Sequence, residues 1–295
     1  MGLEITGRYC MVTGASSGIG REIALGLAKL GARVIMVSRD ALRGKTALEY
    51  VHKGSGNQSV ELMLADLSSQ AQVKELVSTL RAKTNSLHLL VNNAGIIMGK
   101  RELSVDGIEM TFAVNYLAYF MLTNLVVDLL KQGAPARVVN LTSSVHRNTR
   151  LEFDNLQGER RYNRDRAYAQ SKLADIIFTV ELARRLEGTG VAANSVCPGA
   201  VSSNIWEPSS KVIATFFRLL MKGPEQGAVL PLYVASSGEV AGVTGKYFQT
   251  GQHLKGVAVK TGGTACRTSA HACDKDTARK LWRVSESLAG ISSSI

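Results

Sequence analysis

The chain has 295 residues, 45% of them hydrophobic, and a formal net charge of +11. This length exceeds the usual single domain, but open α/β folds reach it with one continuous sheet, and no internal repeat interrupts the chain. No apolar run reaches about 18 residues, which excludes a membrane-spanning helix in the sequence given, and the first predicted strand begins too close to Met1 for a signal peptide.

Short apolar strands alternate with helical segments along the chain. The sequence predicts strands at 9–12, 33–38, 60–65, 87–91, 137–141 and 191–196. Helices are expected at about 21–30, between the second strand and about residue 53, between the third strand and about residue 83, and at about 107–131 and 168–186. Apolar strands spaced by helices indicate a parallel sheet that is covered on both faces. Right-handed crossovers then give a doubly wound, three-layer α/β fold, a Rossmann fold of one domain, with ligand sites at the carboxyl ends of the strands.

A glycine-rich turn follows the first strand. Gly14, Gly18 and Gly20 are spaced G-x-x-x-G-x-G between a strand and a helix. This arrangement aims backbone N–H groups and a helix N-terminus at a pyrophosphate, and the glycines permit a tight turn and close approach of the backbone. An ordinary strand-to-helix turn is the alternative, but the flanking strand and helix favour a dinucleotide site.

Tyr168 and Lys172 lie one turn apart on a predicted helix and therefore share a face. A nearby ammonium can make a phenol a working acid, although lowering the tyrosine pKa of about 10 by about three units needs roughly 4 kcal/mol and a partly dry site. An exposed helix pair is the alternative. Asp66, Asn92, Ser143 and Pro198 all follow strands directly, so they are expected at the same edge of the sheet.

Several motifs in order then carry a resemblance to a family. Thr13-Gly14-x-x-x-Gly18-x-Gly20, Asn92-Asn93-Ala94-Gly95, Asn115, Ser143, Tyr168-x-x-x-Lys172 and Pro198-Gly199 resemble the motif set of the short-chain dehydrogenase/reductases, over about residues 5 to 250. Within that superfamily the chain is most similar to the retinol-dehydrogenase-like group. That closer resemblance lies in Ser38-Arg39-Asp40, in Asn155-Leu156-Gln157-Gly158-Glu159, in the flanks of Tyr168 and Lys172, and in Leu281-Trp282-x-x-Ser285.

The resemblance implies roles for the site residues. Tyr168 would be the general acid or base, Lys172 would depress the phenol's pKa and bind the nicotinamide ribose, Ser143 would hold the substrate oxygen, and Asn115 would order a water in the proton relay. Thr142 and Ser144 flank Ser143, and alignment on the family favours Ser143. Asn115 could equally bond a neighbouring backbone group. The implied cofactor-binding residues are Gly14, Ser16, Ser17, Gly18, Ile19, Gly20, Arg39, Asp66, Leu67, Asn93, Ala94, Gly95, Tyr168, Lys172, Pro198, Gly199, Val201 and Ser203.

The end of the second strand predicts the cofactor. NAD-selective sites place a carboxylate there, whereas this chain has Ser38 and Arg39, about 20 residues beyond the glycine turn. A guanidinium matches the 2′-phosphate of NADP, and Arg21 or Arg43 could add a second contact. The alternative is a surface arginine paired with Asp40 or Glu22. We therefore predict an NADP(H)-dependent enzyme, a carbonyl reductase or alcohol dehydrogenase, that acts on a lipophilic retinoid, steroid or long-chain aldehyde or ketone.

Two other functions stay open: a nucleotide-sugar epimerase or dehydratase of the wider superfamily, and a non-catalytic dinucleotide-binding protein. No nucleic-acid module is evident. The four scattered cysteines favour a reduced, cytoplasmic protein. Cys266, His271 and Cys273 have an unusual spacing for a metal, and no metal site is predicted.

Three expectations concern segments rather than single residues. The cationic, apolar stretch 211–222 lies within an expected substrate-covering segment at about 202–223 and would form a pocket lid or rest on a membrane surface. A C-terminal extension is expected at about 251–295, and its part 252–273 has no functional interpretation. Peripheral contact with a membrane and assembly into a homo-oligomer are both left open.

Overall fold

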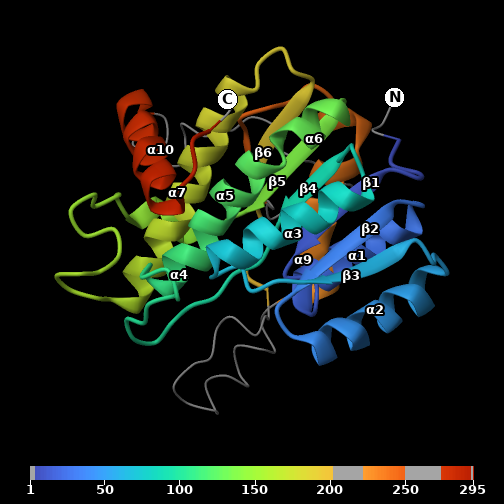
Figure 1. Cartoon of the computed structure of the whole chain (residues 1–295), viewed down its shortest axis with the longest axis horizontal. Helices are drawn as coiled ribbons and strands as arrows, with labels where there is room; N and C mark the ends of the chain where they lie inside the picture. The colour runs from blue at the N-terminus through green and yellow to red at the C-terminus, as the bar shows by residue number, and fades with distance from the viewer. Residues whose placement is uncertain (1–3, 202–221, 250–273, 294) are drawn as a thin grey trace.

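The computed structural model describes residues 4–201, 222–249, 274–293 and 295, and its core is a seven-stranded parallel sheet (Figure 1). The strands are β1 (Tyr9–Thr13), β2 (Arg33–Ser38), β3 (Val60–Leu64), β4 (Leu89–Asn92), β5 (Ala136–Leu141), β6 (Val191–Cys197) and β7 (Tyr247–Gln249). Their order is β3-β2-β1-β4-β5-β6-β7. The order reverses between β1 and β4, and ligands bind at such a switch point in doubly wound folds.

Helices cover both faces of the sheet, as Figure 1 shows. The longer ones are α1 (Gly18–Lys29), α2 (Ala41–Ser55), α3 (Gln70–Lys83), α5 (Ala118–Leu125), α6 (Val127–Gln132), α7 (Arg164–Arg185), α9 (Pro224–Ser236) and α10 (Lys275–Ala289). Helices α1, α2 and α9 pack together, while α3 packs on α5 and α10 packs on α7. The predicted doubly wound α/β fold is therefore confirmed.

Strand β1 shows how the sheet supplies both cores. Met11 belongs to one hydrophobic cluster, whereas its neighbours Cys10 and Val12 belong to the other, and all three are fully buried. Successive side chains of a strand point to opposite faces, so an uninterrupted apolar run is what a strand buried on both faces requires. Five of the six predicted strands differ from the observed ones by no more than one residue at either end.

The predicted helix at 107–131 is wrong in its continuity. This stretch contains α4 (Met110–Phe112), a π-helical turn η1 (Ala113–Leu117), α5 and α6. Asn115 sits in the π-turn with its side chain bonded to the backbone of Ile96, and at Val126 φ is −111° between α5 and α6. These interruptions come from tertiary contacts and a local kink, which an apolar helical pattern does not reveal.

Two further 3₁₀ turns, η2 (Ser144–Asn148) and η3 (Gly238–Val240), complete the described elements. Within the described residues, no helix combines the length and hydropathy that crossing a membrane requires. The stretch 211–221, nearly all of the expected substrate-covering segment, and the stretch 252–273 with Cys266, His271 and Cys273 lie outside the described residues.

Candidate active site

The glycine turn after β1 forms a cradle with no room for side chains. Gly14 has φ +66°, and a Cβ there would lie 2.7 Å from the Ala94 Cα. A Cβ on Gly20 would lie 2.5 Å from the Gly14 carbonyl oxygen, whereas at Gly18, with φ +57°, nothing lies within 4 Å. Gly14 and Gly20 thus permit close packing of the turn, and Gly18 opens its outer side. This combination fits a phosphate-binding turn.

Helix α1 begins at this cradle with its N-terminus free to bind an anion. Ser17 is the N-cap, its side chain makes no capping hydrogen bond, and the first turn carries no acidic residue. The first amide N–H groups of a helix have no partner within the helix and carry a partial positive charge. Ser16, Ser17 and Ile19 surround this point and are partly exposed. These features fit the pyrophosphate of a dinucleotide.

The loop after β4 is fastened to the same turn. Asn93 donates its side-chain amide to the Thr13 carbonyl oxygen at 2.8 Å, and the Thr13 hydroxyl accepts from the backbone N–H groups of Asn93 (2.9 Å) and Ala94 (3.1 Å). Thr13 is fully buried, so these bonds hold the switch point together in a site shielded from water. The predicted residues Asn93, Ala94 and Gly95 therefore lie beside Gly14 and Gly20.

At the end of β2, the Arg39 side chain is exposed and forms no ion pair with any described residue. The acidic partners considered for it are engaged elsewhere. Asp40 caps α2 by accepting from the Arg43 N–H at 2.9 Å, and Glu22 pairs with Arg21 at 2.7 Å. Arg21 also stacks on the Tyr50 ring, 3.9 Å from its centroid. Arg39 is therefore available to an anionic ligand, and Arg21 is not.

Two other predicted groups lie at the same edge. After β3, the Asp66 carboxylate accepts from the Ser68 N–H (2.9 Å) and hydroxyl (2.7 Å), while Leu67 is buried in the core. After β6, Pro198 is followed by Gly199 with φ +88°. Val201 pairs with Lys222 in an isolated bridge. The predicted cofactor residue Ser203 lies outside the described residues.

The two hydroxyls expected to face the substrate meet at the ends of β5 and α7. The Ser143 side chain lies beside the Tyr168 phenol, close enough to lower the pKa of that phenol. Thr142 donates to the Lys172 carbonyl oxygen at 2.8 Å, and Ser144 is exposed. Of the three consecutive hydroxyls, Ser143 is therefore the one that the fold places against the phenol.

Burial dominates the acid–base behaviour of Tyr168 in this structure. Although the residue keeps some exposure, burial of its phenol raises the pKa of Tyr168 to about 12, the Ser143 side chain lowers it, and Cys197 and Asp175 raise it further. The lowering expected from Lys172 is not among these effects. In the described structure that ammonium is turned toward another partner.

That partner is Asp175, one turn further along α7. The Lys172 Nζ lies 2.8 Å from the Asp175 Oδ2 and donates to the Leu141 carbonyl oxygen at 2.9 Å. The side chain of Lys172 is 6% exposed and that of Asp175 is 0% exposed. Asp175 was not predicted from the sequence, although its i,i+3 spacing from Lys172 is typical of an ion pair on one helix.

Asn115 links the loop after β4 to α7. Its side chain accepts from the Ile96 N–H at 2.8 Å, and it donates to the Ile96 carbonyl oxygen at 2.9 Å and to the Ser171 hydroxyl at 3.1 Å. Asn115 therefore bonds the backbone of a loop 19 residues away, next to the Tyr168–Lys172 turn. Tyr119, also missed, donates to the Ala94 carbonyl oxygen at 2.7 Å, and its ring centroid lies 5.2 Å from the Lys172 Nζ.

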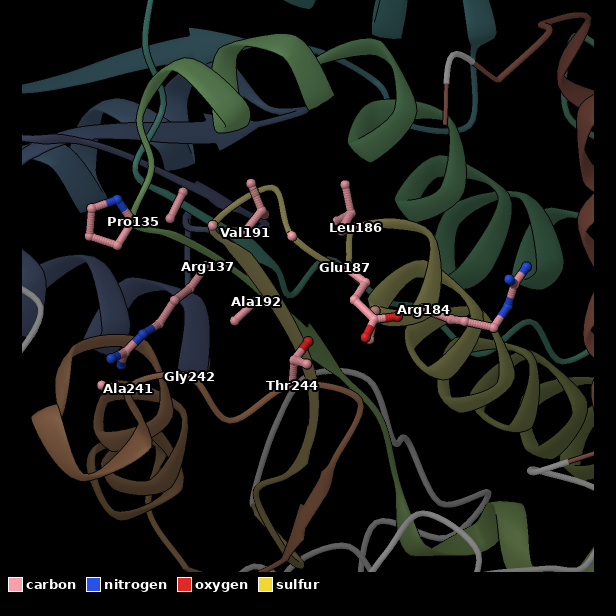
Figure 2. Close-up of a pocket in the computed structure, with 14 residues that line it drawn as sticks. Pro135, Arg137, Arg184, Leu186, Glu187, Val191, Ala192, Ala241, Gly242 and Thr244 are labelled. Atoms are coloured by element: carbon pink, nitrogen blue, oxygen red, sulfur yellow. The ribbon is translucent and has the colours of Figure 1, made fainter.

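A cavity of about 610 Å³ lies at the opposite edge of the sheet, where β5 and β6 begin (Figure 2). Its wall includes Arg137, Glu187 and Thr244, and none of the predicted site residues lines it. The Arg137 guanidinium donates to the carbonyl oxygens of Val234 (3.0 Å) and Ser237 (2.8 Å). Arg137 therefore caps the C-terminal end of α9, which is a structural role.

Comparison with known proteins identifies the family. The family model described as short chain dehydrogenase matches residues 8–213, and the chain belongs to this family. Within it the chain is retinol-dehydrogenase-like. It is 39% identical to retinol dehydrogenase 12 of Mus musculus over 292 residues, and 39% identical to retinol dehydrogenase 11 of Homo sapiens over 291 residues. Each alignment covers 98% of this chain and 88% of the relative.

Solved structures share the fold. A crystal structure of an uncharacterised protein from Mycobacterium paratuberculosis matches with a TM-score of 0.75 and 29% identity, covering 99% of this chain and 97% of that one. A Pseudomonas aeruginosa RhlG/NADP active-site complex matches with a TM-score of 0.67 and 28% identity, covering 83% and 95%. The chain is thus an oxidoreductase of a family that binds a nicotinamide dinucleotide.

Proposed function

We propose that this protein is an NADP(H)-dependent oxidoreductase that interconverts an alcohol and a carbonyl on a lipophilic substrate by direct hydride transfer. The observation that carries the proposal is the position of the Ser143 side chain beside the Tyr168 phenol, close enough to lower its pKa, with Lys172 one turn further along α7. This group lies at the same edge of the sheet as the glycine cradle, so a nicotinamide and a carbonyl can meet beside it.

In the proposed mechanism, NADPH supplies the hydride when it is bound. The Tyr168 phenol donates its proton to the carbonyl oxygen as negative charge develops there, and the Ser143 hydroxyl donates a second hydrogen bond to the same oxygen. Two of the three Lys172 N–H groups already have acceptors, Asp175 and the Leu141 carbonyl oxygen. The third is left for the ribose or the phenolate, and a site closed over the substrate would strengthen its effect on the phenol. Asn115 holds the loop that carries Ile96 against this turn.

The preference for NADP rests on Arg39. Its guanidinium is exposed at the carboxyl end of β2 with no ion pair to a described residue, and the nearest carboxylate, Asp40, is committed to capping α2. A charged hydrogen bond of about 1.5–3 kcal/mol to the 2′-phosphate would favour NADP over NAD by about ten- to a hundredfold. The neighbouring structure titled as an NADP complex supports this proposal by analogy.

The substrate class is proposed from the similar proteins, which are retinol dehydrogenases 12 and 11. A retinoid, a steroid or a long-chain aldehyde or ketone would suit a site of this group. We propose carbonyl reduction as the working direction, because an NADP-linked enzyme in a reducing compartment meets mostly the reduced cofactor.

The test is NADPH consumption by the purified protein with aldehydes and ketones of graded chain length, run beside Tyr168→Phe. Turnover that rises with chain length in the wild type and is lost in the variant would support the proposal. An inactive wild type that still binds NADPH would instead favour a non-catalytic dinucleotide-binding protein.

A further inference from the structure

Asp175 is a fully buried carboxylate to which the proposed mechanism assigns no role in the reaction. It lies on α7 with 0% exposure, and its Oδ2 contacts the Lys172 ammonium at 2.8 Å. Its other oxygen, Oδ1, is buried and has no hydrogen-bond partner among the described residues. A buried charge costs several kcal/mol unless it is paired and hydrogen-bonded. A half-satisfied carboxylate beside a catalytic lysine therefore calls for an explanation.

We propose that Asp175 is a positioning residue that anchors the Lys172 ammonium and whose charge sets the pH range in which Tyr168 works as acid and base. This inference rests on the proposed roles of Tyr168 and Lys172. It adds a carboxylate to the residues that determine the reaction.

The geometry supports an anchor. An ammonium has three N–H donors. The Asp175 Oδ2 takes one at 2.8 Å and the Leu141 carbonyl oxygen takes another at 2.9 Å. These two acceptors leave one N–H donor of the ammonium for another partner. Lysine is otherwise a flexible side chain with many rotamers, so fixing its end prepares the site for the ribose and the phenol.

The charge of Asp175 reaches three elements. It raises the pKa of Tyr168 on α7, of Tyr116 in η1 and of Tyr119 on α5. Burial raises the pKa of Asp175 itself to about 7, against the lowering effect of Lys172. The carboxylate therefore opposes the lysine, and Tyr168 feels a nearly neutral pair rather than a lone cation.

Three other titratable groups on elements packed against α7 are not among the groups that shift the pKa of Asp175. His146 in η2 bonds the Ser143 carbonyl oxygen through its Nδ1 at 2.6 Å and lies against the Tyr247 ring. Glu109 caps α4 by accepting from the N–H groups of Thr111 and Phe112. On β6, Cys197 acts on Tyr168 but is not among the groups that shift Asp175. Lys172 is thus the charged group to which Asp175 responds.

The test is Asp175→Asn, which keeps the size and one acceptor oxygen but removes the charge. In alcohol oxidation with NADP⁺, the acid limb of the kcat/KM profile should move to lower pH by about one unit, so that the variant is about tenfold faster on that limb. Asp165→Asn, an exposed carboxylate on the first turn of the same helix, is the matched control and should leave the profile in place. Should Asp175→Asn fail to fold, Asp175→Ser carries the same expectation.

A second variant and a cofactor-free measurement separate the anchor from the charge. Asp175→Ala removes the acceptor as well, and the KM for NADPH should rise more than in Asp175→Asn. In urea unfolding without cofactor, the wild type should lose stability between about pH 4 and pH 7 relative to Asp175→Asn. The native carboxyl keeps its proton up to about pH 7, whereas the unfolded one releases it near 3.8, so stability falls as pH rises through that window.

A pH profile of Asp175→Asn that superimposes on the wild type would overturn the inference, even if the variant were less stable, because a purely structural carboxylate changes stability alone. Measuring Tyr168→Phe in parallel distinguishes failure of the proposed function from failure of the role of Asp175. If that variant stays active, the proposed function itself fails; if it is inactive while the Asp175→Asn profile is unmoved, only the role of Asp175 fails.

Discussion

The two edges of the sheet differ in what they hold. At the carboxyl edge, polar groups converge from distant parts of the chain: the Ser143 side chain lies beside the Tyr168 phenol, and Lys172 and Asp175 form an ion pair with both side chains at most 6% exposed. At the amino edge, around the 610 Å³ cavity, the buried Arg137 bonds two carbonyl oxygens that end α9. The carboxyl edge brings titratable side chains together, whereas at the amino edge a buried arginine supplies hydrogen-bond donors to backbone carbonyl oxygens.

The large cavity of this protein therefore does not mark the position of the predicted catalytic and cofactor-binding residues. The cavity is lined by parts of β5, β6 and the end of α7, and its arginines have structural partners. Groups that could bind or react lie where strands end and the strand order reverses. Changes at the carboxyl edge should therefore alter turnover, whereas changes at the amino edge should alter stability.

The largest effect is expected from Tyr168→Phe. Removing one hydroxyl should leave the fold and NADPH binding intact but reduce kcat/KM by about 10²–10⁴, the usual value of general acid catalysis. Tyr233→Phe on α9 is the matched control, because its hydroxyl donates to Glu239 and is not part of the predicted site. A Tyr168→Phe variant within about tenfold of the wild type would place the acid elsewhere.

Lys172→Met should weaken NADPH binding and raise the pH at which Tyr168 ionises, both together. Lys172 is the buried cation of the site, and its loss also leaves Asp175 without the partner that lowers its pKa, so Asp175 should take up a proton. Lys246→Met, an exposed lysine just before β7, is the control. Equal inflections in the pH–rate profiles of Lys172→Met and the wild type would refute the electrostatic role.

A smaller effect is expected from Arg39→Asp, because only the cofactor preference should change. The ratio of kcat/KM for NADPH over NADH should fall by about ten- to a hundredfold or reverse, since a carboxylate repels the 2′-phosphate. Arg33→Asp lies on the same strand at the amino edge and should leave the ratio unchanged. If the wild-type protein used NADH and NADPH equally, the role of Arg39 would be wrong.

The sequence predicted those parts of the molecule that depend on local pattern. Arg33–Ser38 is observed as a strand with the predicted ends because an apolar run between turn signals leaves few alternatives. The π-turn around Asn115 could not be predicted, because its cause is a contact with Ile96, which lies 19 residues away. Strand β7 was also missed, since its three residues are too short for a periodic signal.

The candidate site divides in the same way. Gly14, Tyr168 and Lys172 could be predicted as site residues from the sequence, because each belongs to a motif whose residue spacing indicates its function. The direction of the Lys172 ammonium could not, because it depends on how deeply α7 is buried against β5 and on the side chain of Asp175. Burial also reverses the expected shift in the pKa of Tyr168, an effect that no spacing records.

The last prediction tests the amino edge, where turnover should not change. Arg137→Met keeps the aliphatic stem but leaves the carbonyl oxygens of Val234 and Ser237 without their donor. Because Arg137 is only 4% exposed, removal of its charge also relieves a desolvation cost, so the expected loss is about 1–3 kcal/mol in the free energy of unfolding in urea. Arg184→Met, on the same cavity but half exposed and paired with Glu181, should cost less than about 1 kcal/mol. Both variants should keep kcat/KM within about twofold of the wild type, since neither side chain lies near the carboxyl edge. A folded Arg137→Met protein that loses more than about tenfold in kcat/KM, an effect of the size of a general acid's contribution, would show that the two edges are coupled.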